Sequence, residues 1–306
     1  MSVEVKAPAS LLLGLVRHGP SLLAAGLTVR YPPVHLEARP SARLEVSGAC
    51  APIGYAAAER VGLAAEIEVE LAIPTLMGLA SGPMLALSVA RALAELHGRP
   101  ADAPTLAQAL GFSPDLAPEV WGFAQGGLLL TDLGAPLVNP PLRRQAIAHK
   151  DDVAWVIVLF LPRPGDDAPE NLEADRRAAL LAAARHLPAE AARGLLDELW
   201  PAVERDDFPA FAQALGALHA ANLDALAAAG TPLPLSDQQH AMLDLMRAEG
   251  AAMCGPCLTG LGVFGLIQGA PPSIRLRQKM QALVGFAGGT VMGTITDNAG
   301  VQVQPL

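Results

Sequence analysis

The sequence predicts an α+β protein, in which strands and helices alternate along the chain. Residues 66–73 alternate polar and apolar side chains with a period of two, which is typical of a strand with one buried face. Residues 85–96 are rich in Ala and Leu and are followed by His97 and Gly98, a pattern typical of a helix that ends at a glycine. Strand and helix signals of this kind recur in both halves without an internal repeat, so the chain belongs to the α+β class.

The first half begins with strand signals and continues with helical ones. Three segments read as strands, at residues 3–7, 11–16 and 34–38. The Gly-Pro pair at 19–20 and the Pro-Pro pair at 32–33 are expected to end the strands beside them, because proline lacks the backbone N–H that a strand donates. Two helices and a strand then follow, at residues 50–65, 104–110 and 127–131.

The second half opens with a strand at residues 154–161, whose apolar run has the length of a buried strand. Four helices are expected after it, at residues 171–186, 189–199, 208–229 and 236–249. Their Leu spacing of three to four suits helix packing, and we expect their Asp and Glu side chains to lie on solvated faces. The chain returns to strand between residues 285 and 303.

Composition and charge exclude several classes of protein. No run reaches the roughly 18 apolar residues of a membrane span, and the first residues lack the features of a signal peptide, so we expect a cytoplasmic protein without a membrane partner. The net charge is −9, and no basic cluster exceeds the pairs at 143–144 and 176–177, which disfavours nucleic acid as a partner. An anionic small-molecule substrate remains compatible with the net negative charge, because a few hydrogen-bond donors at the binding site can outweigh the charge of the whole protein.

The three cysteines form no disulfide framework, since their number is odd and their spacing wide. Residues 254–257 read Cys-Gly-Pro-Cys, the redox motif of thioredoxin. That chemistry needs the first Cys at the start of a helix that follows a strand. Here an expected helix precedes the motif and a Gly-rich segment follows it, so a redox pair is disfavoured, and a structural metal site still more.

The clearest candidate site is the loop between the strand at residues 66–73 and the helix at residues 85–96. This first glycine loop comprises Gly78, Leu79, Ala80, Ser81 and Gly82. Backbone N–H groups that converge at the start of a helix favour a phosphate group. Ser81 is a candidate ligand of phosphate or Mg²⁺. An ordinary tight turn, with Ser81 as the helix cap, is the alternative reading.

A second glycine loop, residues 255–262, offers a second candidate anion-binding nest, or else a plain turn. Its candidate residues are Gly255, Thr259, Gly260 and Gly262. Asp132, at the end of the strand at 127–131, is the candidate metal or ribose ligand, although Asp there is also a common turn former. The cations nearest to these segments are Lys6, Arg17 and Arg143, for which a solvated surface position is the alternative.

Five segments carry a resemblance to the GHMP kinase superfamily. Residues 74–93 resemble its Pro-x(3)-Gly-Leu-Gly-Ser-Ser-Ala motif, a loop that wraps nucleotide phosphates. Residues 5–15, 123–132, 255–265 and 288–300 are similar to segments of one group, the β-ribofuranosylaminobenzene 5′-phosphate synthases. The chain departs from these patterns at several positions. It has Ser10 and Leu12 where that group has Arg and His, and it has Pro256, Cys257 and Leu258 in place of Gln-Ser-Ser.

The resemblance implies an architecture of two halves. Residues 1–145 would form a half like the second domain of ribosomal protein S5, and residues 146–306 a ferredoxin-like half. The two would meet at a cleft, with the boundary near residues 140–152, where the chain is rich in proline. We expect both glycine loops to face that cleft.

The resemblance also implies an activity. It would be a transferase that condenses phosphoribosyl pyrophosphate with a 4-aminobenzoate-type acceptor, with loss of carbon dioxide, in the biosynthesis of methanopterin-type cofactors. Mg²⁺ would bridge the pyrophosphate. Two alternatives stay open: an ATP-dependent small-molecule kinase of the GHMP type, and a non-catalytic relative that binds a metabolite or a partner subunit, of which a homodimer is one form. The sequence identifies no catalytic residue.

Overall fold

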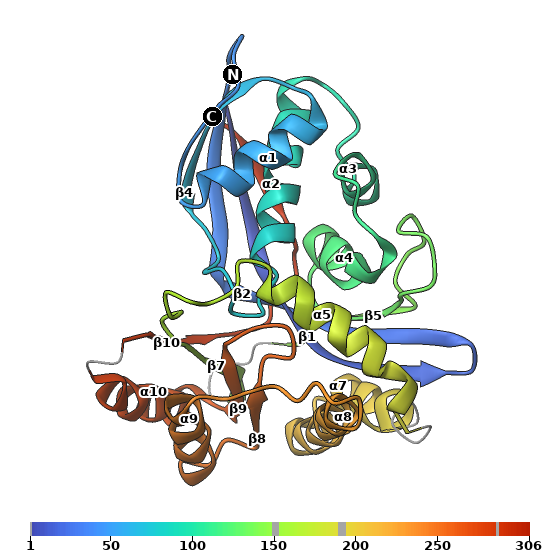
Figure 1. Cartoon of the computed structure of the whole chain (residues 1–306), viewed down its shortest axis with the longest axis vertical. Coiled ribbons are helices and arrows are strands. Elements are labelled where there is room, and N and C mark those ends of the chain that lie inside the picture. Colours follow the sequence, from blue (N-terminus) through green and yellow to red (C-terminus); the bar gives the residue numbers. More distant parts are fainter. Residues whose placement is uncertain (1, 149–152, 189–193, 286–287) are drawn as a thin grey trace.

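Two β-sheets, each with helices packed against it, organise the chain (Figure 1). The computed structural model describes residues 2–148, 153–188, 194–285 and 288–306. In the view of Figure 1 the first sheet and helices α1 to α4 form the upper part, and the second sheet with α8, α9 and α10 forms the lower part. Helix α5 crosses the region between them. None of the described helices combines the length and the apolar character that crossing a membrane requires.

The elements of the upper part come mostly from the first half of the chain. Its strands are β1 (Val3–His18), β2 (Ser21–Pro40), β3 (Glu45–Gly48), β4 (Ala65–Leu71), β5 (Leu128–Asp132), β6 (Arg143–Gln145) and, from the other end of the chain, β11 (Gln302–Pro305). Its helices are α1 (Ala51–Val61), α2 (Ser81–Leu96), α3 (Ala103–Ala109), the 3₁₀ turn η1 (Pro114–Leu116) and α4 (Ala117–Gln125).

The elements of the lower part follow. Its strands are β7 (Trp155–Leu161), β8 (Met253–Pro256), β9 (Val263–Gln268) and β10 (Thr290–Thr294). Its helical elements are α5 (Leu172–Ala183), η3 (Ala184–His186), the π-helical turn η4 (Gly194–Leu199), α7 (Trp200–Glu204), α8 (Phe208–Ala228), α9 (Asp237–Ala248) and α10 (Ala270–Val284). Residues 189–193 of the helix expected at 189–199 lie outside the described residues, as do 286 and 287 of the strand region expected at 285–303.

The first sheet is built on the long hairpin of β1 and β2, and its path runs β11-β1-β2-β4-β3. The start of β2 also pairs with β5, and its end pairs with β4. The strand break predicted at the Pro-Pro pair is wrong, because β2 continues through it. The prolines fall where the register with β1 shifts, between the pairs Ala7↔Val34 and Ala9↔Val29. No ladder partner requires an N–H from residues 32 and 33 there, so proline is tolerated.

The second sheet has the order β10-β7-β9-β8, and all of its pairs are antiparallel. This order, with α10 between β9 and β10, is the ferredoxin-like arrangement that the resemblance implied. Strand β7 is buried on both faces. Its side chains alternate between a core shared with the upper part, which contains Ile157, and a core closed by α9 and α10, which contains Val158. The apolar run that predicted this strand reflects that double burial.

The last strand, β11, returns to the first sheet and pairs with the start of β1, from Val3↔Pro305 to Lys6↔Gln302. The two ends of the chain therefore lie side by side at the top of Figure 1. The boundary between 145 and 146 remains a prediction, and residues 149–152 of the predicted connector lie outside the described part of the chain.

Helices α4 and α10 were not predicted, and both have proline in their first turn. Pro118 lies in the first turn of α4, where a missing N–H costs nothing.

The two cysteines of the Cys-Gly-Pro-Cys motif do not face each other in the fold. Cys254 packs in the α9/α10 core and Cys257 in the shared core, so the two free thiols lie on opposite faces of the second sheet. Burial raises the pKa of Cys257 to about 12, which leaves it protonated at neutral pH.

Candidate functional site

The first glycine loop connects β4 to α2 and has an unusual backbone. Leu76, Gly78 and Ala80 all adopt positive φ, at 68°, 78° and 58°. The left-handed region costs a residue with a side chain roughly 1–2 kcal/mol, so the loop stores strain at Leu76 and Ala80. Ala80 stands at the N-cap of α2 without a capping side chain. The alternative reading of Ser81 as the helix cap is therefore wrong, since Ser81 is already the first residue of the helix.

The second glycine loop packs directly against the first. The Leu261 N–H donates to the carbonyl of Leu76 at 2.7 Å, and the Gly262 N–H donates to the carbonyl of Met77 at 3.1 Å. The fit depends on two glycines. A Cβ added to Gly260 would lie 1.9 Å from the backbone N of Gly78, and one added to Gly78 would lie 2.8 Å from the N of Gly260. The structure thus brings these two loops together backbone to backbone.

Parts of both loops line one wall of a cavity of about 430 Å³, whereas Gly78, Leu79, Gly260 and Gly262 are not among its lining residues. Ser81 and Gly82 contribute from the first loop and Thr259 from the second, while η1 and α5 close the other sides. Ile53, Leu116 and Leu181 add apolar surface. The cavity lies at the N-terminus of α2. The first four N–H groups of a helix have no intrahelical partner, and since Pro83 has no N–H, those of Ala80, Ser81 and Gly82 remain here.

Gly255 lies apart from this wall, although the sequence placed it in the same loop. It belongs to β8, and a Cβ at this position would lie 2.5 Å from Nε2 of His219 in α8. Its glycine is required for close packing of α8 on the second sheet. His219 is buried, and its ring lies edge-on to Phe264 with 5.6 Å between the centroids. Burial lowers the pKa of His219 to about 4, an effect that the backbone of Leu13 partly offsets.

A side chain that the sequence analysis did not single out occupies the first glycine loop. The Gly78 N–H donates to Glu173 Oε1 at 2.7 Å, and the Ser81 hydroxyl donates to Glu173 Oε2 at 3.4 Å. Glu173 stands in the first turn of α5 and is partly buried. Burial raises the pKa of this carboxyl, against the opposing effects of the Gly78 N–H and of Arg177. The expectation that the acidic residues of this helix are solvated is wrong for Glu173.

The next turn of α5 carries two arginines, Arg176 and Arg177, of which Arg177 lines the cavity. Arg176 donates to the carbonyl of Gly260, and Arg177 donates to the carbonyl of Asp115 at 2.9 Å and forms an ion pair with Glu119. Glu119 is 2% exposed, and its second oxygen, Oε2, has no hydrogen-bond partner among the described residues. Helix α5 therefore binds both glycine loops and the start of α4 through three charged side chains. No sequence signal distinguished these residues from an ordinary helix surface.

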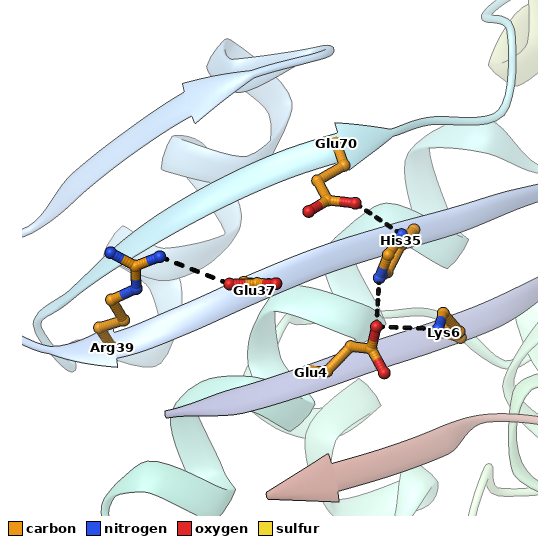
Figure 2. A network of polar contacts seen from close by, with 6 residues as sticks. All are labelled: Glu4, Lys6, His35, Glu37, Arg39 and Glu70. Atoms are coloured by element: carbon orange, nitrogen blue, oxygen red, sulfur yellow. Dashed lines mark hydrogen bonds and ion pairs between the residues drawn. The ribbon is translucent and has the colours of Figure 1, made fainter. Parts of the chain in front are cut away.

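Lys6 lies far from the first glycine loop along β1, on the open face of the first sheet. Figure 2 shows that Lys6 Nζ pairs with Glu4 at 2.8 Å and that the same carboxylate contacts His35 Nε2 at 2.7 Å. Nδ1 of His35 faces Glu70 at 2.8 Å. The bonds from Lys6 and then His35 lower the pKa of Glu4. Lys6 lines a different cavity, of about 630 Å³, together with residues of β2 and the turn at 297–300.

The remaining predicted residues also lie outside the 430 Å³ cavity. Arg17 is exposed near the tip of the β1–β2 hairpin, and Arg143 is exposed on β6. Asp132 accepts hydrogen bonds from the Ser21 hydroxyl and from the Gly134 N–H, both at 2.9 Å, so its carboxylate closes the turn after β5. Within the described ranges, no three His, Cys, Asp or Glu side chains lie close enough together to hold a metal ion.

Comparisons with known proteins agree with this fold. No protein-family model and no curated protein matches the chain. Among solved structures, homoserine kinase from Cytophaga hutchinsonii is 14% identical with a TM-score of 0.65, over 99% of this chain and 97% of that chain. A putative sugar kinase from Campylobacter jejuni is 15% identical with a TM-score of 0.63, over 99% and 98%.

The mevalonate diphosphate decarboxylase from Enterococcus faecalis, an ATP-binding protein, is 12% identical with a TM-score of 0.64, over 100% of this chain and 99% of that chain. Sequence identity is low in all three cases, so the likeness concerns the fold. The likeness extends over 99–100% of this chain in all three cases. This chain therefore has the GHMP kinase fold, as its motifs predicted.

Proposed function

We propose that this chain is a GHMP-type phosphotransferase that binds a phosphate-bearing small molecule in the 430 Å³ cavity. The observation that carries the proposal is the pair of interlocked glycine loops beside that cavity at the start of α2. Backbone N–H groups and the helix dipole favour negative charge at this position. The structural neighbours include two kinases and an ATP-binding decarboxylase, which supports a nucleotide as the donor.

Phosphoryl transfer would need little covalent chemistry from the protein. The acceptor oxygen attacks the terminal phosphorus, the bond from phosphorus to the bridging oxygen breaks, and the acceptor proton leaves. Positioning and electrostatic stabilisation carry the rate of such reactions. The N–H groups at the start of α2 are the donors available for the phosphate, and the apolar walls would hold the acceptor. The Gly78 N–H and the Ser81 hydroxyl donate to Glu173 and would serve the phosphate only if that carboxylate moved away.

The carboxylates in and beside the cavity are the side chains that could hold Mg²⁺. The oxygens of Glu173 already accept from Gly78 and Ser81, and Glu119 is paired with the guanidinium of Arg177. The carboxylates that line the cavity are Asp115, Glu170 and Glu173, and within the described residues no three such groups lie close enough together to hold a metal ion, so this set does not form a resident Mg²⁺ site. Asp132 belongs to a turn outside the cavity, and its role as a metal ligand stays a prediction. In this proposal Mg²⁺ enters with the substrate, bound to the nucleotide phosphates.

Two other functions use the same cavity. A transferase of the β-ribofuranosylaminobenzene 5′-phosphate synthase type would bind phosphoribosyl pyrophosphate through the same loops, and it rests on the motif resemblance. A non-catalytic relative is favoured by one specific observation, the Glu173 carboxylate on the first glycine loop, which takes donors that a phosphate would use. The two enzymes differ in the donor molecule, which is ATP for one and phosphoribosyl pyrophosphate for the other. The non-catalytic relative would bind neither of these donors.

Thermal stabilisation by each donor separates these functions, since a ligand that binds the native state raises its stability. MgATP and Mg-phosphoribosyl pyrophosphate are compared on the wild-type protein and on Gly82→Leu. Gly82 lines the cavity and has open space around its Cβ, so Leu should block the ligand while leaving the fold intact. Ala109→Leu, on an exposed position of α3 outside the cavity, is the control.

A shift with MgATP that Gly82→Leu abolishes and Ala109→Leu preserves supports the phosphotransferase. A shift with phosphoribosyl pyrophosphate alone favours the other transferase. Absence of both shifts refutes the proposal and favours the non-catalytic relative. A donor shift that Gly82→Leu leaves unchanged would place the ligand away from this cavity.

A further inference from the structure

The Glu173 carboxylate lies where the first glycine loop presents its donors. Its two oxygens accept from the Gly78 N–H at 2.7 Å and from the Ser81 hydroxyl at 3.4 Å. Both groups would serve an oxygen of a bound phosphate equally well, because a carboxylate and a phosphate accept the same hydrogen bonds. These two donors are therefore already satisfied from within the chain.

We propose that Glu173 is an internal occupant of the first glycine loop and determines which ligands that loop accepts. A phosphate group binds there only after the Glu173 carboxylate has left the Gly78 N–H. This inference rests on the proposed function, since it concerns the same loop. It makes Glu173 a residue that sets specificity against weak anions, which cannot displace a carboxylate held at such close range.

The surroundings of Glu173 give the displaced carboxylate a place to go. Arg177 lies one turn further along α5 and acts electrostatically on Glu173. Its guanidinium presents five N–H donors, of which Glu119 and the carbonyl of Asp115 take only some. Glu119 and Cys257 face the same region, and the charge of Glu119 repels Glu173. A rotation of Glu173 towards Arg177 would free Gly78 without moving the backbone of α5.

Two negative groups cannot share the loop at low cost. The distances above place any phosphate oxygen at Gly78 within a few ångströms of the Glu173 carboxylate, where like charges in a partly buried site repel strongly. Removing the charge of Glu173 should therefore strengthen phosphate binding. Glu173→Gln keeps the shape of the side chain, whereas Glu173→Ala also removes the occupant.

Inorganic pyrophosphate is titrated into the wild-type protein, Glu173→Gln and Glu173→Ala in a calorimeter, which measures the affinity of each protein for pyrophosphate. The control is Asp175→Asn, which removes the same charge from an exposed position of α5 outside the cavity. We expect pyrophosphate to bind at least tenfold more tightly to both Glu173 variants than to the wild type, and with unchanged affinity to Asp175→Asn. Equal gains in Asp175→Asn would mean a general charge effect and overturn the inference.

A second measurement tests the occupancy without any ligand. The amide proton of Gly78 is followed by NMR in the wild type during an acid titration and in Glu173→Gln. A Gly78 signal that moves in both experiments, and not in Asp175→Asn, supports the bond to Glu173. A Gly78 signal that responds neither to the acid titration nor to Glu173→Gln overturns the inference. This test does not use Glu173→Ala, so it holds even where that variant does not fold.

The two readouts separate this inference from the proposed function. If the Gly78 signal reports Glu173 but neither pyrophosphate nor MgATP binds the wild type or any variant, phosphate binding at the loop is refuted, and the competition with it. If the wild type binds pyrophosphate and the Glu173 variants bind it no more tightly, the proposed function stands and the competition by Glu173 is refuted.

Discussion

The buried ring of His219 should make the stability of this protein sensitive to mild acid. Its folded pKa is lowered from 6.5 to about 4 by burial against Gly255 and Phe264. A group whose pKa is depressed on folding stabilises the fold above its unfolded value. The contribution is therefore complete above pH 6.5 and is lost as the pH falls from 6.5 through about 4. With about 1.4 kcal/mol for each pKa unit, the loss amounts to about 3 kcal/mol by pH 4.

Urea unfolding at pH 7.5 and pH 4 measures this loss in the wild type and in His219→Leu, which keeps an apolar side chain of similar size in the same packing. Carboxyl groups titrate in both proteins, so the relevant quantity is the difference between them. We expect the wild type to lose about 3 kcal/mol more free energy of unfolding than the variant between the two pH values. His240→Gln, on an exposed position of α9, should behave as the wild type. Equal losses in the wild type and His219→Leu would refute the reasoning.

Three further substitutions follow from the contacts described above. Gly260→Ala should destabilise the protein by about 3 kcal/mol or more in chemical unfolding, because its Cβ would lie 1.9 Å from the N of Gly78; a cost under about 0.5 kcal/mol would mean that the loops are not interlocked. Asn222→Ala should cost about 3 kcal/mol, since the buried Asn222 side chain bonds both the N–H and the carbonyl of Leu15, and an unchanged urea midpoint would contradict this. A raised folded pKa means that Glu173 stabilises the fold in acid and that this stability is lost as the pH rises from 4.5 through the folded pKa. The melting temperature of Glu173→Gln should therefore rise relative to that of the wild type over this pH range. An equal difference in melting temperature at pH 4 and pH 8 would contradict this prediction.

Local patterns predicted the elements that are buried in a regular way. The alternation at 66–73 became β4, whose side chains alternate between buried and exposed, and the apolar run at 154–161 became β7, which is buried on both faces. Helix α2 was predicted from its composition and its glycine stop. The strand break predicted at the Pro-Pro pair of β2 is wrong, because the effect of a missing N–H depends on whether the fold requires that N–H. A sequence pattern does not contain that information.

The sequence predicted a candidate site in two loops, and the structure brings these loops together with helix α5. The glycines at 78 and 260 were chosen for their effect on the backbone, and the close approach of the two loops requires them. Glu173 was missed because a Glu in the first turn of a helix is common on solvated surfaces, and its neighbour Gly78 is 95 residues away. Lys6 was chosen for its charge and its nearness in sequence to a motif, yet β1 carries it away from the loop.

The return of β11 to the first sheet ties the order of synthesis to the order of folding. The N–H and carbonyl groups along the outer edge of β1, from Val3 to Lys6, have no strand beside them until residues 302–305 have been made. During synthesis the first sheet must wait with one edge open while the second sheet forms below it, and open edges invite pairing with other chains.

Cutting the chain between its halves would leave that edge open permanently. A fragment that ends at residue 145 should therefore aggregate. The same fragment supplied with residues 302–306 through a short linker should aggregate less, although it still exposes the core that it shares with β7 in the full chain. Because the two ends of the chain lie side by side in Figure 1, they can be joined and the chain reopened elsewhere. A circular permutant opened in the connector would synthesise both partners of this pair in succession, and it should fold with fewer losses to aggregation than the natural order.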